Sequence, residues 1–294
     1  MSTLAIVNPV AGNRAAARVW EKVRSEFELG RTWQCAITEH RGHALELARS
    51  AAANGHERVI AVGGDGTINE VANGLAHSPT SLGLIMAGTG NDIGRNLRIP
   101  KHPVAAARLA ATGVPAALDL CEVEIRERTR LVMGIAGFGF DAEVAWRVNR
   151  MPKFGGTLPY VAGVLQTLWR YGSPRMQITV DGQLLEKRVF LVAVGNLPSF
   201  AGGMRIVPRA EPHDGLLDVC VVKDLSRLEV VRMLPRLYSG GHVGHPAVEM
   251  FRCRSVSADA DGRALCQADG ELVGELPARF AVRVGALRCV TGPM

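Results

Sequence analysis

Two glycine-rich turns, each directly after a short apolar segment, constrain the fold of this chain more than any other feature. Arg58–Val62 ends in Gly63-Gly64-Asp65-Gly66-Thr67, and Leu82–Ala87 ends in Gly88-Thr89-Gly90-Asn91-Asp92. A helix-like segment follows the first turn. Strands that end in glycine turns and alternate with helices predict a doubly wound α/β domain, with a ligand at the carboxyl ends of its strands.

The rest of the first part of the chain supports this prediction. It contains two more strand-like segments and two helix-like segments, at Leu4–Asn8, Trp33–Thr38, residues 14–27 and His43–Ala53. Thr67 and Glu70 have the spacing of a capping box, which predicts a helix with Thr67 as its N-cap. We therefore assign residues 1–120 to an α/β domain.

Strand-like segments dominate after about residue 116. They lie at Ala117–Ile125, Arg130–Phe138, Met176–Val180, Arg188–Val194, Leu217–Val222, Glu249–Val256 and Arg279–Val284. Asp181-Gly182, Asp261-Gly262 and Asp269-Gly270 read as hairpin turns, and two helical insertions are expected at Leu158–Arg170 and Arg227–Tyr238. The fold class is therefore α/β plus β. Residues 121–284 form a mostly antiparallel β domain, and a last strand at about 285–294 returns to the first domain.

The composition is that of a globular protein suited to an anionic partner. Of the 294 residues, 47% are hydrophobic and 21% are charged, and Lys+Arg exceed Asp+Glu by 34 − 28 = 6. The basic residues are dispersed and aromatic residues make up 5%, so we expect no nucleic-acid partner. No apolar run reaches the ~18–20 residues that cross a bilayer, and Pro9 interrupts the N-terminal run. We expect neither a transmembrane segment nor a signal peptide.

Cysteine and histidine spacing indicates no metal site. The six cysteines are scattered without a C-x-x-C pair, which is typical of reduced structural thiols in a cytoplasmic protein. His40/His43 and His242/His245 lie in glycine-containing segments, where we see no cysteine or carboxylate at ligand spacing.

The glycine turns have the properties of a phosphate site that also holds a metal. Backbone N–H groups without a nearby Cβ, at the start of a helix, bind phosphate well. Asp65 and Asp92 lie inside the turns, where they would repel phosphate unless a cation such as Mg²⁺ intervened. A third acidic turn, Asp269-Gly270-Glu271, is a candidate to complete the site. Each of these segments also has a simpler interpretation, as a tight turn without a ligand.

Two standard nucleotide motifs are absent. The chain has no G-x-x-x-x-G-K-[ST] sequence, and Gly88, Gly90 and Gly94 are spaced one residue too far apart for the dinucleotide fingerprint. A P-loop kinase and a Rossmann dehydrogenase are therefore disfavoured.

Together the motifs resemble those of the diacylglycerol kinase catalytic domain family, which includes sphingosine and ceramide kinases and, more remotely, NAD kinase. The matching segments are Asn8-Pro9-Val10-Ala11-Gly12, Gly63–Glu70, Gly88–Asp92, Gly137–Asp141, Gly195-Asn196, Gly202-Gly203-Met204, Asp214–Asp218 and Asp269–Glu271. They span nearly the whole chain in order. The resemblance implies an ATP- and Mg²⁺-dependent lipid kinase. It also implies that residues 1–120 form the nucleotide-binding domain and that the active site lies in the cleft between the two domains.

The resemblance also implies roles for individual residues. The positions matching ATP contacts are Asn8, Pro9, Ala11, Gly12, Thr38, Gly63, Gly64, Asp65, Gly66, Thr67, Asn69 and Thr89. We also assign Asn91 and Asp92, in the same loop as Thr89, to nucleotide binding. Glu271 matches the catalytic acid/base, with Asp269 beside it. Our own hypothesis is that Asp65, Asp92 and Asp269 position the catalytic Mg²⁺, directly or through water. Glu211, Asp214 and Leu216 match a structural Mg²⁺ site. Where the family usually has a small hydroxyl residue, this chain has Ala11. The missing hydroxyl removes one possible hydrogen bond to phosphate, with a net contribution of ~0.5–1.5 kcal/mol.

The acceptor is less constrained than the donor. We expect the acceptor to be a lipid primary hydroxyl. We expect the enzyme to be cytoplasmic and to associate peripherally with the inner membrane face. A homodimer is an open alternative to a monomer. Apolar residues 158–170, including Trp169, would line an acyl-chain cleft, touch a bilayer or simply pack in the core. The alternatives are a kinase of NAD or a small polar alcohol, and a non-catalytic nucleotide or lipid sensor that retains the fold.

Overall fold

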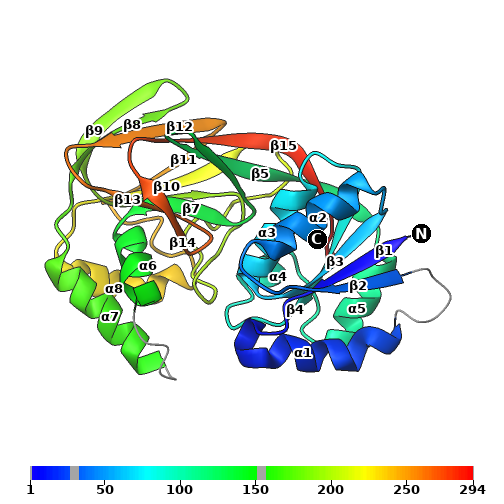
Figure 1. Cartoon of the computed structure of the whole chain (residues 1–294). Helices are drawn as coiled ribbons and strands as arrows, with labels where there is room; N and C mark the ends of the chain where they lie inside the picture. The colour runs from blue at the N-terminus through cyan, green and yellow to red at the C-terminus, as the bar shows by residue number, and fades with distance from the viewer. Residues whose placement is uncertain (1, 27–32, 151–156, 294) are drawn as a thin grey trace. The chain divides into compact units, whose positions relative to one another are not determined.

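The structure is a computed structural model that describes residues 2–26, 33–150 and 157–293 (Figure 1). The chain divides into two compact units. Unit 1 comprises Met1–Leu120, Pro212–Asp214 and Arg283–Met294, and unit 2 comprises Cys121–Glu211 and Gly215–Val282. Phe27, the predicted end of the first helix, lies outside the described residues.

Unit 1 is built on a parallel sheet. Its strands are β1 (Thr3–Val7), β2 (Trp33–Ile37), β3 (Arg58–Gly63), β4 (Ser81–Met86) and the end of β15 (Ala278–Val290), in the order β15-β4-β3-β1-β2. Val7 pairs with both Ile37 and Val62. β1 and β3 are buried along their whole length, as expected of apolar strands covered on both faces. The four predicted strands lie within one residue of their observed positions.

Helices cover both faces of this sheet (Figure 1). On one face, α1 (Ala11–Val23) and α5 (Pro103–Thr112) bury Trp20 and Ala107 against the strands. On the other face, α2 (His43–Ala53) and α3 (Asp65–Leu75) pack against each other and the strands. The predicted doubly wound α/β architecture is confirmed. α4 (Asp92–Asn96) is a short helix after the second glycine turn.

The predicted capping box is wrong. α3 starts at Asp65, three residues earlier than expected, with Gly64 as its N-cap and no side-chain cap. The Thr67 hydroxyl instead accepts a hydrogen bond from the Asn8 side-chain amide at 2.9 Å. Glu70 accepts one from the backbone N–H of Gly42 at 3.0 Å. Both side chains are engaged in tertiary contacts, which local spacing cannot predict.

Unit 2 is mostly antiparallel β structure, as predicted. Its strands are β5 (Pro115–Ile125, which begins in unit 1), β6 (Arg128–Val132), β7 (Ile135–Gly139), β8 (Arg175–Val180), β9 (Gln183–Gly195), β10 (Leu217–Lys223), β11 (Val248–Cys253), β12 (Ser255–Ala260), β13 (Leu265–Ala268), β14 (Glu271–Glu275) and the start of β15. The start of β9 pairs with β8, whereas its end pairs with β7 and β10. This long strand therefore joins two groups of strands around one core.

Three details of the β prediction need correction. The single strands expected at Arg130–Phe138 and Glu249–Val256 are each two strands, β6 with β7 and β11 with β12. Asp261-Gly262 does not close a hairpin, because β12 pairs with β8 and β15 while β13 pairs with β7 and β14. Apolar runs indicate strand content, but the partner of each strand is set by tertiary packing.

Three helices accompany these strands on one side of unit 2 (Figure 1). They are α6 (Phe140–Arg150), α7 (Thr157–Arg170) and α8 (Arg227–Leu237). The sequence predicted α7 and α8 but not α6. In the described part of the chain, no helix is long and apolar enough to cross a membrane.

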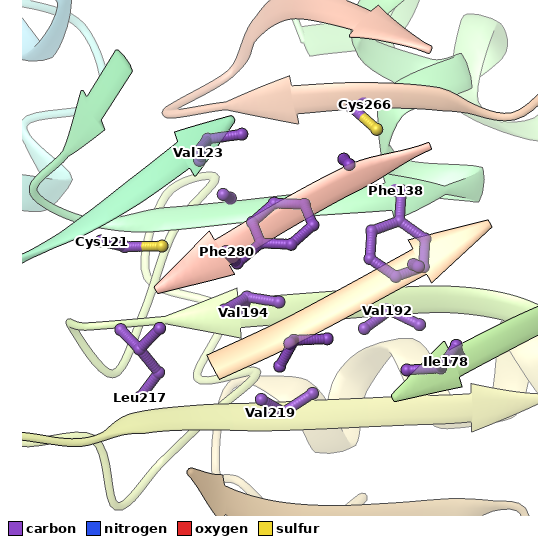
Figure 2. Packing of buried hydrophobic residues seen from close by; sticks show 14 of the residues in the cluster. Cys121, Val123, Phe138, Ile178, Val192, Val194, Leu217, Val219, Cys266 and Phe280 are labelled. Atoms are coloured by element: carbon purple, nitrogen blue, oxygen red, sulfur yellow. The ribbon is translucent and has the colours of Figure 1, made fainter. Parts of the chain in front are cut away.

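Two phenylalanines form the centre of the unit 2 core (Figure 2). Phe138 on β7 and Phe280 on β15 are both fully buried, and their rings stack with centroids 5.6 Å apart.

We expect Phe280→Ala to lower the free energy of unfolding by ~3–5 kcal/mol, because it removes buried apolar surface and leaves a cavity. Urea denaturation measures this change. Leu184→Ala, at a side chain that is 56% exposed, is the control and should change stability by less than ~0.5 kcal/mol. Equal losses in the two variants would contradict the prediction.

Candidate active site

Four predicted nucleotide-binding segments of unit 1 meet at one edge of its sheet. Asn8–Gly12 follows β1, Thr38 follows β2, Gly64–Thr67 follows β3, and Gly88–Asp92 follows β4. Because these strands are parallel neighbours, their carboxyl ends lie side by side. Backbone hydrogen bonds continue the strand pairing into the loops, from Thr38 N to the Val7 carbonyl at 2.9 Å and from Ala87 N to the Gly63 carbonyl at 2.7 Å.

Glycines allow these loops to pack backbone against backbone. Gly12 has a φ of +58°, and a Cβ there would lie 2.1 Å from the Ala87 carbonyl oxygen. A Cβ on Gly88 would lie 2.6 Å from the Gly64 Cα. A larger residue at either position would separate the loops, so the spacing of the site depends on these glycines.

The start of α3 is suited to an anion. The first N–H groups of a helix have no intrahelical acceptors, and its dipole places partial positive charge there. In α3 these groups belong to Asp65, Gly66 and Thr67, and Gly66 is exposed. A phosphate group fits this end of the helix.

Two carboxylates converge beside the second glycine loop. A Cβ on Gly90 would lie 3.2 Å from Oδ2 of both Asp65 and Asp92. Oδ1 of Asp65 accepts a hydrogen bond from the Ile93 N–H at 3.0 Å. Burial raises the pKa of Asp65, and the charge of Asp92 raises it further. The pair therefore favours a nearby cation, and its all-oxygen donor set fits Mg²⁺.

Arg95 already supplies one positive charge at this place. Its guanidinium forms an ion pair with Asp92 and donates to the Gly90 carbonyl at 3.0 Å. Sequence analysis did not single out Arg95. The available signal was the spacing of Asp92 and Arg95, three residues apart at the start of a helix.

Other predicted ATP contacts have structural roles in this conformation. Asn69 is fully buried and accepts a hydrogen bond from the Asn73 amide at 2.6 Å, one helical turn later. The side chain of Asn91 accepts from the Gly88 N–H at 2.8 Å and so shapes its own loop. Thr89 is exposed, whereas Pro9 and Ala11 are half-buried.

The predicted acid/base residues belong to unit 2, on the hairpin of β13 and β14. Asp269 and Gly270 form its two-residue turn with φ values of 48° and 81°. Oδ1 of Asp269 accepts hydrogen bonds from the N–H groups of Gly134 at 3.1 Å and Ile135 at 3.0 Å. This carboxylate therefore fixes the turn to the start of β7. Glu271 is the first residue of β14 and pairs with Arg130 of β6 at 2.8 Å.

A buried carboxyl group, that of Asp141, is connected to the same turn through Gln267. The Gly270 N–H donates to Oε1 of Gln267 at 2.9 Å, and Nε2 of Gln267 donates to Oδ2 of Asp141 at 3.0 Å. Asp141 lies in the segment Gly137–Asp141. Its Oδ1 is buried and has no hydrogen-bond partner among the described residues. Burial raises the pKa of Asp141 to about 6, although the Gln267 hydrogen bond opposes this rise.

Asp141 should make stability depend on pH. In the unfolded chain the carboxyl ionises near pH ~3.9, so between that pH and about 6 only the native state holds the proton. Its contribution to stability is then complete below pH ~4 and is lost as pH rises through 6. Relative to Asp141→Asn, we expect the wild-type protein to lose ~1–3 kcal/mol between pH 4 and pH 7.5. Urea denaturation of both proteins across this range measures it, and a constant difference would contradict it.

The predicted structural metal residues lie on the loop before β10. Glu211 is exposed, Asp214 and Leu216 are half-buried, and Gly215 turns the chain with a φ of +75°. The available donors are carboxylate and backbone carbonyl oxygens, which fit Mg²⁺. The structure places a further buried carboxylate, Asp119, next to this loop: its N–H donates to the Pro212 carbonyl at 2.7 Å.

The expectation that no carboxylate lies at ligand spacing from His40 and His43 is wrong. Ligand atoms of His40, His43 and Glu46 all lie within 4.8 Å of one another, because Glu46 follows His43 by about one helical turn. The two imidazole rings are stacked, with centroids 4.7 Å apart and an angle of 8° between their planes. Ring nitrogens in parallel planes do not point at one ion, so this conformation is not a formed metal site.

Two protein-family models match nearly the whole chain. The model of the diacylglycerol kinase catalytic domain matches residues 2–123, and that of the YegS C-terminal NAD kinase beta sandwich-like domain matches residues 134–291. A diacylglycerol kinase of Mycobacterium tuberculosis (strain ATCC 25618 / H37Rv) is 31% identical over 97% of this chain and 93% of its own length. One from Bacillus subtilis (strain 168) is 30% identical over 94% and 91%.

A solved structure has the same fold. A Bacillus anthracis str. Sterne protein, provisionally named a diacylglycerol kinase, superimposes with a TM-score of 0.84 at 24% identity, covering 99% of this chain and 95% of its own. The matching family model and the named relatives define the class of protein, a phosphotransferase that uses a nucleotide. The chain belongs to the diacylglycerol kinase family and is therefore a kinase.

Proposed function

We propose that this kinase transfers the γ-phosphoryl group of ATP to a hydroxyl group of a membrane lipid, in a Mg²⁺-dependent reaction. The observation that carries the proposal is the convergence of Asp65 and Asp92 beside two glycine loops, the first of which leads into α3 and the second into α4. Phosphate-binding N–H groups next to two carboxylates suit a nucleotide that arrives with a divalent cation.

In this proposal unit 1 holds the nucleotide. The N–H groups of Gly64–Thr67 and the exposed Thr89 face the phosphates, and Asn8 keeps the Thr67 hydroxyl in place through its 2.9 Å hydrogen bond. Asp65 and Asp92, with Asp269 directly or through water, would hold Mg²⁺. When bound, Mg²⁺ neutralises charge on the phosphate oxygens. The half-buried Ala11 has no hydroxyl group that could bind a phosphate. In this proposal the backbone N–H groups therefore bind the phosphates without a hydroxyl from residue 11.

Unit 2 supplies the acid/base group. Glu271 accepts the proton of the acceptor hydroxyl while a bond forms between the hydroxyl oxygen and the γ-phosphorus. The bond from that phosphorus to the bridging oxygen breaks, and ADP leaves with the electron pair. Positioning and charge neutralisation supply most of the acceleration in such transfers. Arg130 and Asp269 position the carboxylate, through the 2.8 Å ion pair and through the turn.

A structural cation on the loop before β10 is part of the proposal. Asp214 would bind it through its carboxylate, and Glu211 and Leu216 through backbone carbonyls. The role is to hold the loop rather than to take part in transfer. Calorimetric unfolding with and without Mg²⁺ tests it, since Asp214→Ala should abolish any metal-dependent rise in Tm that the wild-type protein shows.

The lipid acceptor is proposed from the relatives. They are named diacylglycerol kinases, and this chain matches them over nearly their full length. Such an acceptor keeps its acyl chains in a bilayer, so we propose that the enzyme works as a peripheral protein at the cytoplasmic membrane face. Diacylglycerol is the first acceptor to test.

The experiment is a transfer assay with γ-labelled ATP, Mg²⁺ and mixed micelles that contain diacylglycerol, phosphatidylglycerol, a sphingoid base or a prenol. NAD and glycerol are offered in parallel. Label in an organic-soluble product, only when Mg²⁺ and one lipid class are present, supports the proposal and identifies the acceptor class. Label in a polar product overturns the lipid assignment, and transfer to none of them favours a sensor that retains the fold.

A further inference from the structure

Two helices of unit 2 leave large apolar side chains in solvent. Leu165 and Trp169 on α7, Leu228 and Val231 on α8, and Tyr238 just after α8 are five of the ten exposed large apolar residues in the described part of the chain. Trp169 is 68% exposed, and Leu228 and Tyr238 are each 58% exposed. Scattered single residues of this kind need no explanation, but a concentration on two helices does.

These side chains lie on the outer faces of helices that cover one core. Leu168 of α7 and Val230 and Met233 of α8 are buried in the same apolar cluster. The Arg227 guanidinium of α8 donates to the Tyr171 carbonyl, directly after α7, at 3.1 Å. Both helices lie on the same side of unit 2 (Figure 1). Each packs one face against this core, and the face that points away from the core is turned to solvent.

The residues follow the period of a helix. Leu165 and Trp169 are four residues apart, and Leu228, Val231 and Tyr238 are separated by three and seven, so each set lies on one face of its helix. α8 is thus apolar on two faces, one packed in the core and one in water. Core packing does not account for the second face.

The charged residues of α7 and α8 themselves are mostly positive. Arg170, Arg227, Arg232 and Arg236 are all exposed on the same two helices. Glu229 is the one acidic residue within the bounds of α8, and it is hydrogen-bonded to Ser226 in a capping box at the start of that helix. Apolar and aromatic residues bordered by arginines are typical of helices that lie in the interface of an anionic bilayer.

We propose that this α7–α8 face, made of Leu165, Trp169, Leu228, Val231 and Tyr238 with the four arginines, docks on the surface of an anionic lipid bilayer. The proposal deepens the proposed function, on which it rests, because a membrane-embedded acceptor must be reached from that surface. A second copy of the chain is the less suitable occupant. In a two-fold dimer the same patch faces itself, which would bring eight arginines together.

Vesicle flotation tests the docking surface without any need for activity. The probes are vesicles of phosphatidylcholine alone and of phosphatidylcholine with about 30% phosphatidylglycerol, an anionic lipid. We expect the full chain to bind the anionic vesicles and to lose binding as salt rises. Trp169→Glu with Leu228→Glu should lower the partition coefficient at least ~10-fold, and Arg232→Glu with Arg236→Glu should have a similar effect.

Leu184→Glu is the matched control, because Leu184 is 56% exposed on β9 of the same unit and lies outside the face. An equal loss of binding in this control, no loss in the face variants, or no binding by the wild-type protein would overturn the proposal. Analytical ultracentrifugation provides a second criterion. A dimer that dissociates in the Leu228→Glu variant would assign the face to self-association instead.

Activity measurements separate this proposal from the proposed function. If both are right, the face variants retain turnover of a monomeric short-chain diacylglycerol and lose turnover of the same acceptor in anionic vesicles. Vesicle binding that depends on the face, without turnover of any lipid, would overturn the proposed function and support the docking surface. Equal turnover of vesicle acceptor by wild-type and face variants would overturn the docking surface alone.

Discussion

Replacing Glu271 by glutamine should lower kcat for phosphoryl transfer by ~10²–10⁴-fold, the usual contribution of a positioned acid/base group. Glutamine has nearly the same shape but does not accept the hydroxyl proton. Nucleotide affinity should be nearly unchanged, since the predicted nucleotide contacts belong to unit 1. Initial rates with labelled ATP measure kcat, and titration calorimetry measures the nucleotide Kd.

Glu275→Gln is a closely matched control. Glu275 lies on the same strand and pairs with Arg263 at 2.8 Å, as Glu271 pairs with Arg130 at 2.8 Å. Their side chains are 41% and 30% exposed. The control should retain kcat near the wild-type value. A Glu271→Gln variant with near-wild-type kcat, or an equal loss in both variants, would show that the acid/base role is wrong.

Replacing Gly88 by alanine should weaken nucleotide binding at least ~10²-fold, or by about 2.7 kcal/mol. The added methyl group would lie 2.6 Å from the Gly64 Cα and 3.0 Å from Oδ1 of Asn91. The nearer contact is backbone, so the two glycine loops must move apart and the phosphate-binding groups lose their spacing. Titration calorimetry with ATP and Mg²⁺ measures the change in Kd.

Gly172→Ala controls for the added methyl group itself, because no atom lies within 4 Å of a Cβ at that position. It should leave the Kd for ATP unchanged. Gly90→Ala is the milder variant within the site, since its methyl group would meet only carboxylate oxygens, at 3.2 Å. It should weaken binding less than Gly88→Ala and retain the wild-type Tm. Unchanged Kd values in both site variants would exclude the glycine loops from nucleotide binding.

The limits of prediction are visible in particular elements. Strands β1 to β4 were located within one residue. The signal was clearest for β3 and β4, because these buried parallel strands appear as apolar runs that end in glycine turns. By contrast, α6 was missed: it begins at Phe140, directly after the glycine-rich strand β7, with no capping signal. The capping box at Thr67 failed because Asn8, 59 residues earlier, binds that hydroxyl.

The candidate site divides in the same way. The sequence alone determined the fold class, the family resemblance and the identity of the glycines and carboxylates, because these depend on residue type and local spacing. Only the tertiary structure decided which of them act on one another. It joined Asp65 with Asp92, paired Glu271 with Arg130, and tied Asp269 to the start of β7. It also left the outer faces of α7 and α8 exposed. Burial, ion pairing and exposure depend on residues far apart in the chain, and no local pattern encodes them.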